Sequence, residues 1–301
     1  CQVSKIAVVF NSKKISKSRL ETFFPAAQFF KTRELEKLEE FELAEFDLCV
    51  VAGGDGTLRS VVQYLMENHI KIPVGIIPVG TGNILARNLG IPMDIKGASK
   101  IALAGNHREI DLGKAKVGSE PAMFFTGISG LGLDASIMEN THPKLKKRIG
   151  WVAYIEGGIR SLPPKFEKFE VTVDNNQTKT LKVLTLIVAN TGTLPGKLSL
   201  LPDAQVDDGN LDVAAIGPRK IWNWIDVLGR ILWQNRFVRP LVVGRKLMDA
   251  TSNLKSLEYL SGKKITVVSE KESNFQLDGD LMTPAKKVTF QVMPKALLVA
   301  C

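Results

Sequence analysis

Short apolar runs that alternate with polar, helix-like stretches set out the first 112 residues of the chain. A run of about five apolar residues is too short for a helix and is typical of a buried strand. The runs of this kind are Ile6–Phe10, Leu48–Ala52 and Val74–Val79, and the shorter segment Gln28–Phe30 is a further predicted strand. Residues 34–45, 58–68 and 84–89 have helical spacing or composition. The alternation predicts an α/β domain at 1–112, with a doubly wound, Rossmann-like arrangement.

The pattern changes near Ala115, where apolar segments separated by turn residues begin to dominate. Such a series predicts a mainly antiparallel β-sandwich as a second domain over residues 113–293, and residues 294–301 are expected to return to the first domain. The predicted strands are 123–128, 168–173, 181–190, 211–216, 264–268 and 287–293. Two stretches, 144–162 and 219–237, are predicted to be helical.

A glycine-rich turn separates the strand Leu48–Ala52 from the helix that follows it. It consists of Gly53, Gly54, Asp55, Gly56 and Thr57. Glycine lets a ligand approach the backbone closely, and the free N–H groups at a helix start favour phosphate. An acid beside a phosphate indicates a magnesium ion or an ordered water between them. The alternative interpretation is a tight turn in which Thr57 caps the helix.

A second glycine turn, formed by Gly80, Thr81, Gly82 and Asn83, follows the strand Val74–Val79. Crossover connections in a parallel sheet keep one hand, so both turns are expected at the same edge of the sheet. The paired motifs G-G-D-G-T and P-V-G-T-G-N resemble the diacylglycerol kinase catalytic domain, which bacterial lipid kinases, sphingosine kinases and ceramide kinases share. The first motif alone is also similar to NAD kinases.

The resemblance implies an ATP-dependent phosphotransferase that moves the γ-phosphate of ATP to a lipid hydroxyl, with diacylglycerol or a related lipid as the expected substrate. It implies nucleotide contacts for Asn11 and Thr32 in addition to the two glycine turns. The chain departs from the family's Asn-Pro-x-Ser-Gly loop, because Ser12 and two lysines follow Asn11. By themselves, Asn11 is a common turn residue and Thr32 a common helix cap.

The segment Q-L-D-G-D-L at residues 276–281 occupies the place of an Asp-Gly-Glu motif in the family. The family's Glu is the proposed general base, so the resemblance assigns this role to Asp280, with Asp278 as the substitute. A kinase that acts on an alcohol needs a carboxylate to take the hydroxyl proton. The alternative is a plain Asp-Gly hairpin turn.

A further acidic segment, P-D-A-Q-V-D-D-G-N, spans residues 202–210. The resemblance implies a structural magnesium held by the Asp208 carboxylate and the carbonyls of Gln205 and Asn210; a turn without metal is the alternative. The glycine-rich segment at 130–135 matches a family motif near the acyl substrate or the domain interface. By itself the segment predicts a glycine turn before a helix, and Asp134 is equally consistent with a cap of that helix.

Residues 219–246 combine basic and aromatic side chains, which is relevant to how the protein would reach a lipid substrate. The basic residues are Arg219, Lys220, Arg230, Arg236, Arg239, Arg245 and Lys246, and the aromatic ones are Trp222, Trp224, Trp233 and Phe237. A basic amphipathic helix with tryptophans suits peripheral contact with an anionic membrane. The alternative is a core helix with solvated charges. The net charge of +9 gives no reason to expect nucleic acid, because no recognised module accompanies it.

Composition places the 301-residue chain among globular proteins, with 45% apolar and 24% charged residues. Three cysteines at unrelated spacings argue against a disulfide framework, and the chain is expected to be cytoplasmic. The sequence contains no run of 18 or more apolar residues, so no membrane-spanning helix is predicted. Two other functions stay open, an NAD kinase-like enzyme and a non-catalytic nucleotide or membrane sensor that kept the fold. A homodimer also stays open.

Overall fold

A parallel array of strands in the order β2-β1-β3-β4 forms one end of the molecule. The computed structural model describes residues 5–37, 42–132, 166–196, 198–217 and 257–301. The array consists of β1 (Ile6–Phe10), β2 (Gln28–Lys31), β3 (Leu48–Gly53) and β4 (Val74–Pro78). All four runs expected to be strands are therefore strands, and the bounds of β1 are as predicted. Strands β1, β3 and β4 are buried along almost their whole length, which explains why their sequences are continuously apolar, while β2 is an edge strand with exposed ends.

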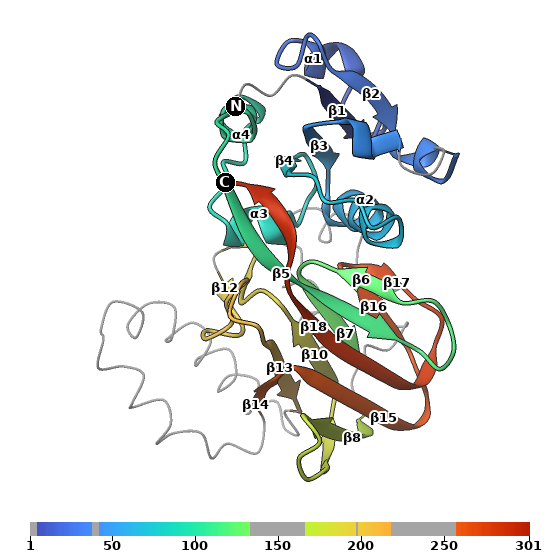
Figure 1. Cartoon of the computed structure of the whole chain (residues 1–301). Helices are drawn as coiled ribbons and strands as arrows, with labels where there is room; N and C mark the ends of the chain where they lie inside the picture. Colours follow the sequence, from blue (N-terminus) through green and yellow to red (C-terminus); the bar gives the residue numbers. More distant parts are fainter. Residues whose placement is uncertain (1–4, 38–41, 133–165, 197, 218–256) are drawn as a thin grey trace, which may run out of the picture.

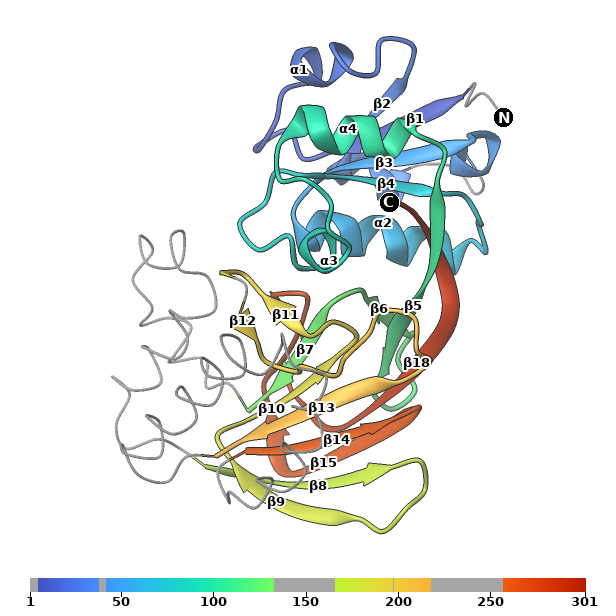
Figure 2. The ribbon, with the colours of Figure 1, turned by 90° about the vertical axis from the view of Figure 1, so that its left-hand side faces the viewer.

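Helices cover both faces of this array, as a doubly wound fold requires. In Figure 2, α4 (Ile95–Leu103) lies on one face of the strands, while α2 (Asp55–Glu67) and α3 (Ile84–Asn88) lie on the opposite face. The short α1 (Lys17–Glu21) follows β1. Helix α2 buries an apolar stripe against the sheet, made of Leu58, Val61, Val62 and Leu65. It begins at Asp55, three residues before its apolar pattern, because Gly54 is the N-cap.

The predicted helix over residues 34–45 is wrong in the described part of that stretch. Two 3₁₀ segments occur instead, η1 (Thr32–Lys37) and η2 (Glu42–Glu45). The Glu34 carboxylate accepts a hydrogen bond from the Lys31 backbone N–H at 2.9 Å and closes a tight turn where an α-helix would start. Short 3₁₀ pieces of this kind are common connectors.

One long strand links the parallel array to the rest of the molecule. Strand β18 (Ala285–Ala300) is antiparallel to β5 (His107–Lys116), and near its end Val299 lies opposite Val74 of β4. Figure 1 shows β18 and β5 passing together from one region into the other. The same ten-stranded sheet also includes β6 (Met123–Phe125), β8 (Glu167–Val173), β9 (Lys179–Val183) and β15 (Lys264–Ser273). The exact division into domains stays a proposal.

A second, six-stranded antiparallel sheet packs against the lower part of the first. Its strands are β14 (Leu257–Gly262), β13 (Leu211–Ile216), β10 (Thr185–Ala189), β7 (Ile128–Leu131), β16 (Phe275–Leu277) and β17 (Asp280–Leu281). A two-stranded ribbon, β11 (Thr193–Leu194) with β12 (Leu198–Ser199), lies beside it. Fully buried phenylalanines from both sheets fill the space between them: Phe125, Phe169, Phe275 and Phe290. The predicted β-sandwich is confirmed.

Two predicted strands are wrong because the chain breaks inside them. Residues 123–128 divide into β6 and β7, since the N–H groups of Thr126 and Gly127 bind the Asp278 carboxylate instead of a neighbouring strand. Residues 181–190 divide at Leu184 into β9 and β10, which belong to different sheets. Because the residues on both sides of each break are apolar, the sequence pattern shows one continuous run where the structure has two strands.

The two predicted helices at 144–162 and 219–237 lie outside the described residues, as does the basic and tryptophan-rich stretch 219–246. Asp134 lies outside them too. None of the described helices combines the length and the apolar composition that a membrane-spanning helix needs.

Candidate active site

The two glycine turns meet at the carboxyl ends of β3 and β4, as their place in the sequence predicts. Gly53 lies opposite Pro78 in the register of the two strands. A Cβ built on Gly80 would overlap the Cα of Gly54, which no real side chain tolerates. Glycine at both positions therefore allows the two backbones to touch.

The Asp55 carboxylate ties the second turn to the first. Its Oδ2 accepts a hydrogen bond from the Asn83 N–H at 2.7 Å, and its Oδ1 accepts one from the Ile84 N–H at 2.6 Å. Burial raises the pKa of Asp55, and these two N–H donors oppose the increase. Asp55 thus satisfies the amides at the start of α3, which a cap would otherwise have to satisfy.

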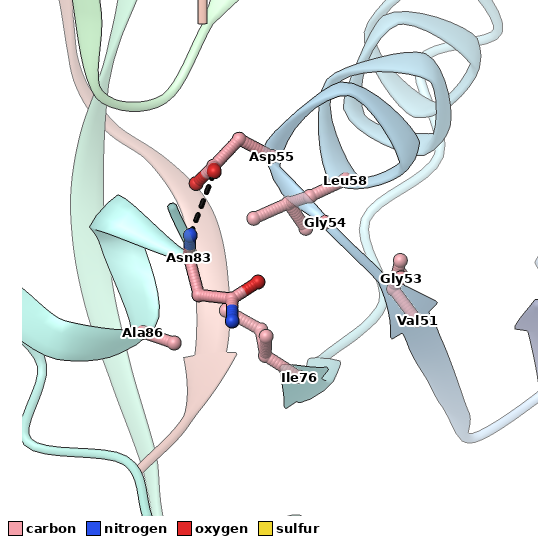
Figure 3. A pocket seen from close by; sticks show the side chains of 8 residues that line it. All are labelled: Val51, Gly53, Gly54, Asp55, Leu58, Ile76, Asn83 and Ala86. Atoms are coloured by element: carbon pink, nitrogen blue, oxygen red, sulfur yellow. Dashed lines mark hydrogen bonds between the residues drawn. The ribbon is translucent and has the colours of Figure 1, made fainter. Parts of the chain in front are cut away.

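A small pocket lies between the two turns (Figure 3). The carboxylate of Asp55 and the side chain of Asn83 border it on one side. The Asn83 side chain also closes its own turn, because its Oδ1 accepts from the Gly80 N–H at 3.0 Å and its Nδ2 donates to the Gly80 carbonyl at 2.9 Å. The remaining lining residues are Val51, Gly53, Gly54, Leu58, Ile76 and Ala86.

The start of α2 offers backbone donors to an anion. Leu58 N–H bonds to the Gly54 carbonyl, so the amides of Gly56 and Thr57 precede the first intrahelical bond of the helix. The helix has 13 residues, and its dipole favours negative charge at this end. Helix starts with exposed amides bind phosphate groups in many proteins.

Asn11 and Thr32, which the resemblance assigned to the nucleotide, follow β1 and β2 at this same edge of the sheet. The Nδ2 of Asn11 lies 3.5 Å from the Oγ1 of Thr57, within weak hydrogen-bond range. The Oγ1 of Thr32 is buried and has no hydrogen-bond partner among the described residues. Because this oxygen is also closed off from solvent, the nucleotide contact assigned to Thr32 stays a prediction.

Asp280 approaches the first turn of α2 from the other sheet. A Cβ on Gly56 would lie 2.9 Å from the Oδ2 of Asp280, so the carboxylate packs directly on the Gly56 backbone. Its Oδ2 also accepts from Arg59 of α2, at 2.8 Å from Nη2 and 3.2 Å from Nε. Sequence reasoning missed Arg59. The available signal was its position one helical turn after Asp55, on the same side of α2.

Asp278 is buried in a nest of backbone donors. Its Oδ1 accepts from the N–H groups of Gly127 and Ile128 at 2.8 and 3.0 Å, and its Oδ2 accepts from the N–H and hydroxyl of Thr126 at 2.8 and 3.2 Å. Burial raises the pKa of Asp278 to about 6, with the Thr126 N–H opposing and the nearby Asp55 charge adding to the increase. Asp278 therefore fixes the hairpin that carries Asp280.

The loop with the predicted metal ligands lies against β5 and β18 and has no hydrogen bond to the glycine turns among the described residues. The Asp111 carboxylate holds this loop by accepting from the Gly209 N–H at 2.6 Å. The Oδ1 of Asp208 accepts from the Asn210 N–H at 2.9 Å, and Gln205 is exposed in the same loop. Burial raises the pKa of Asp208. The described residues contain no cluster of three or more His, Cys, Asp or Glu side chains that could hold a metal ion.

The glycine-rich segment that begins at Gly130 was expected to be a turn. Gly130 and Leu131 belong instead to β7, so the expected turn is wrong for these two residues. Within this segment, Gly132 is the first residue with a positive φ, +78°. A Cβ on Gly132 would touch the Phe169 ring and the Leu184 carbonyl. The strand continues there because Gly130 and Leu131 pair with both β10 and β16.

The structure therefore brings together backbone amides that suit phosphate and a half-exposed carboxylate. The amides come from the start of α2, and Asp280 provides the carboxylate. This set can hold a polyphosphate and accept a proton beside it.

Comparison with known proteins agrees with this geometry. Residues 11–115 match the model of the diacylglycerol kinase catalytic domain, and residues 127–301 match that of the YegS C-terminal NAD kinase beta sandwich-like domain. A diacylglycerol kinase of Bacillus subtilis is 32% identical over 266 residues, which cover 85% of this chain and 81% of that protein. One of Staphylococcus epidermidis is 32% identical over 197 residues, which cover 65% of this chain and 60% of that protein.

Solved structures share the fold at lower identity. A crystal structure of a diacylglycerol kinase from Bacillus anthracis has a TM-score of 0.76 at 22% identity and covers 100% of this chain and 97% of its own. An NAD kinase from Archaeoglobus fulgidus in complex with ATP has a TM-score of 0.53 at 14% identity, covering 99% and 94%. The fold class expected from the sequence is confirmed, and the chain belongs to the diacylglycerol kinase family of lipid kinases.

Proposed function

We propose that the chain transfers the γ-phosphate of ATP to the hydroxyl group of diacylglycerol or a closely related lipid. One observation carries the proposal: the Asp280 carboxylate, from one sheet, rests on the start of α2, where the two glycine turns of the other region meet. A phosphate-binding helix start and a proton acceptor are the two parts that this reaction needs side by side. The family membership supports it.

In this proposal the amides of Gly53–Thr57 and the turn Gly80–Asn83 hold the phosphates, while Asn11 and Thr32 contact the nucleoside. Asp280 takes the proton of the lipid hydroxyl as its oxygen bonds to the γ-phosphorus. The bond from that phosphorus to the bridging oxygen breaks, and the electron pair leaves with ADP. Asp278 has all its acceptor sites engaged and anchors the hairpin, so we assign the base role to Asp280.

Magnesium would neutralise charge on the phosphates when bound. Both oxygens of Asp55 already accept a backbone N–H, so a contact to the nucleotide's magnesium would run through water. The Asp208 loop suits a separate structural magnesium by the chemistry of its donors, because a carboxylate with backbone carbonyls is a hard-cation set. The Asp208 Oδ2 accepts no hydrogen bond among the described residues.

A transfer assay with [γ-³²P]ATP and magnesium tests the proposal. Mixed micelles would present diacylglycerol, a sphingoid base or phosphatidylglycerol in separate reactions, and NAD would be offered in a further one. Label in the diacylglycerol product is expected. Label in NAD alone would establish the NAD kinase-like alternative, and ATP binding without transfer to any acceptor would establish a non-catalytic sensor.

Membrane contact stays a prediction, since the residues that carry it lie outside the described part. Flotation with anionic and neutral vesicles would test it. A homodimer and a cytoplasmic location also stay predictions.

A further inference from the structure

An ion pair crosses from α2 to β17 beside the glycine turns. Arg59 contributes two donors, Nη2 at 2.8 Å and Nε at 3.2 Å, and both reach the same oxygen of Asp280, Oδ2. The Arg59 side chain is 17% exposed and that of Asp280 is 47% exposed. The guanidinium is thus largely packed, while the carboxylate faces solvent on one side.

The pair leaves the second oxygen of Asp280 unengaged. Among the described residues, no hydrogen bond reaches Oδ1, although Oδ2 has two. A guanidinium donates in a fixed plane, so two donors on one oxygen set the orientation of the whole carboxylate. Oδ1 is then held in one direction beside the start of α2.

The backbone of the hairpin is fixed independently of this pair. Asp278, two residues earlier, is locked by the N–H groups of residues 126–128, and Gly279 donates to the Gln276 side chain at 2.6 Å. What remains free is the side chain of Asp280 itself. The family's longer Glu would span more of the gap, so the direction of the shorter Asp side chain decides whether its oxygen reaches the acceptor hydroxyl.

We propose that Arg59 is the positioning residue of the base: its two hydrogen bonds to Oδ2 orient Oδ1 of Asp280 toward the acceptor hydroxyl. This inference rests on the proposed function. The proton of the hydroxyl passes to Oδ1, the oxygen bonds to the γ-phosphorus, and ADP leaves with the electron pair of the broken bond. Arg59 stays charged and paired throughout. A misplacement of about 1 Å in such a group costs about 100-fold in rate.

Arg59→Met tests the inference because it keeps much of the side chain's bulk and removes its donors. We expect kcat to fall about 10- to 100-fold, with the KM values for ATP and lipid within about twofold. Arg59→Lys, with a single-point donor, should fall between wild type and Arg59→Met. Lys179→Met is the control, because Lys179 makes an ion pair of equal length, 2.8 Å, with Glu258 away from the site. Its kcat should equal that of wild type.

A double variant separates positioning from a merely structural role. If Arg59 acts through Asp280, then adding Arg59→Met to Asp280→Asn lowers kcat no further than Asp280→Asn alone. An equal loss in both backgrounds would overturn the inference, as would wild-type kcat in Arg59→Met. If Arg59→Met unfolds, the same comparison is made with Arg59→Lys. A wild-type chain that transfers no phosphate to any lipid would refute the proposed function itself, and the inference with it.

Discussion

Asp55→Asn probes the contact that joins the two glycine turns. The carboxylate has an oxygen for each of two amides, at 2.7 Å from the Asn83 nitrogen and 2.6 Å from the Ile84 nitrogen. An asparagine side chain has one oxygen and one NH₂ group. One of the two backbone N–H groups would then face another donor in a mostly buried place.

The size of the effect follows from the lost bond. A hydrogen bond to a charged acceptor contributes about 1.5–3 kcal/mol net, and a buried unpaired donor costs about 1–3 kcal/mol. Part of this loss is offset, because burial raises the pKa of Asp55 and the neutral asparagine avoids that cost of ionisation. A net loss of about 2 kcal/mol is expected, which lowers Tm by about 3 °C for a chain of this size.

Two assays read the result, thermal unfolding and the binding of a fluorescent ATP analogue. The second turn would no longer be held against the first, so we expect ATP affinity to fall about tenfold, the equivalent of 1.4 kcal/mol. Asp94→Asn is the matched control, since Asp94 caps α4 through one bond to the Gly97 N–H at 2.8 Å and asparagine caps equally well. Unchanged Tm and ATP affinity in Asp55→Asn would refute the reasoning.

Contacts at Gly80, Asp278 and Asp208 can be tested in the same way. Gly80→Ala would force the backbone of Gly80 away from that of Gly54. The free energy of unfolding in urea should fall by about 1–3 kcal/mol, and ATP binding should weaken. Unchanged values would contradict this prediction. The pKa of Asp278 is about 6 in the folded chain and 3.8 in the unfolded chain, so its contribution to stability falls by up to about 3 kcal/mol as pH rises from 4 to 6. Asp278→Asn should therefore lower the free energy of unfolding less at pH 7 than at pH 4. Equal losses at the two pH values would contradict this prediction. Magnesium alone should raise the Tm of the wild type but not of Asp208→Ala, and an equal increase in both would remove Asp208 from the metal site.

The sequence predicts the parallel array well because each strand is a buried apolar run between turn residues. Strands β1 and β13 have the predicted bounds, Ile6–Phe10 and Leu211–Ile216. The meeting of the glycine turns was also predictable, since parallel strands with one-handed crossovers bring their carboxyl ends to one edge. Local pattern and general topology suffice for these features.

The features that the sequence pattern did not predict depend on contacts between residues far apart in the chain. The break between β6 and β7 depends on a carboxylate about 150 positions away, Asp278, which takes the amides of the intervening residues. The pairing of Arg59 with Asp280 spans 221 positions. An arginine on a helix and an acid in a hairpin each read as solvated residues until the fold places them together.

A crystal structure of the chain with magnesium and a non-hydrolysable ATP analogue would show where the triphosphate binds. We expect the triphosphate on the amides of Gly53–Thr57 and beside Gly80–Asn83, with the γ-phosphate next to the Asp280 carboxylate. A triphosphate bound elsewhere, or a γ-phosphate directed away from Asp280, would contradict it.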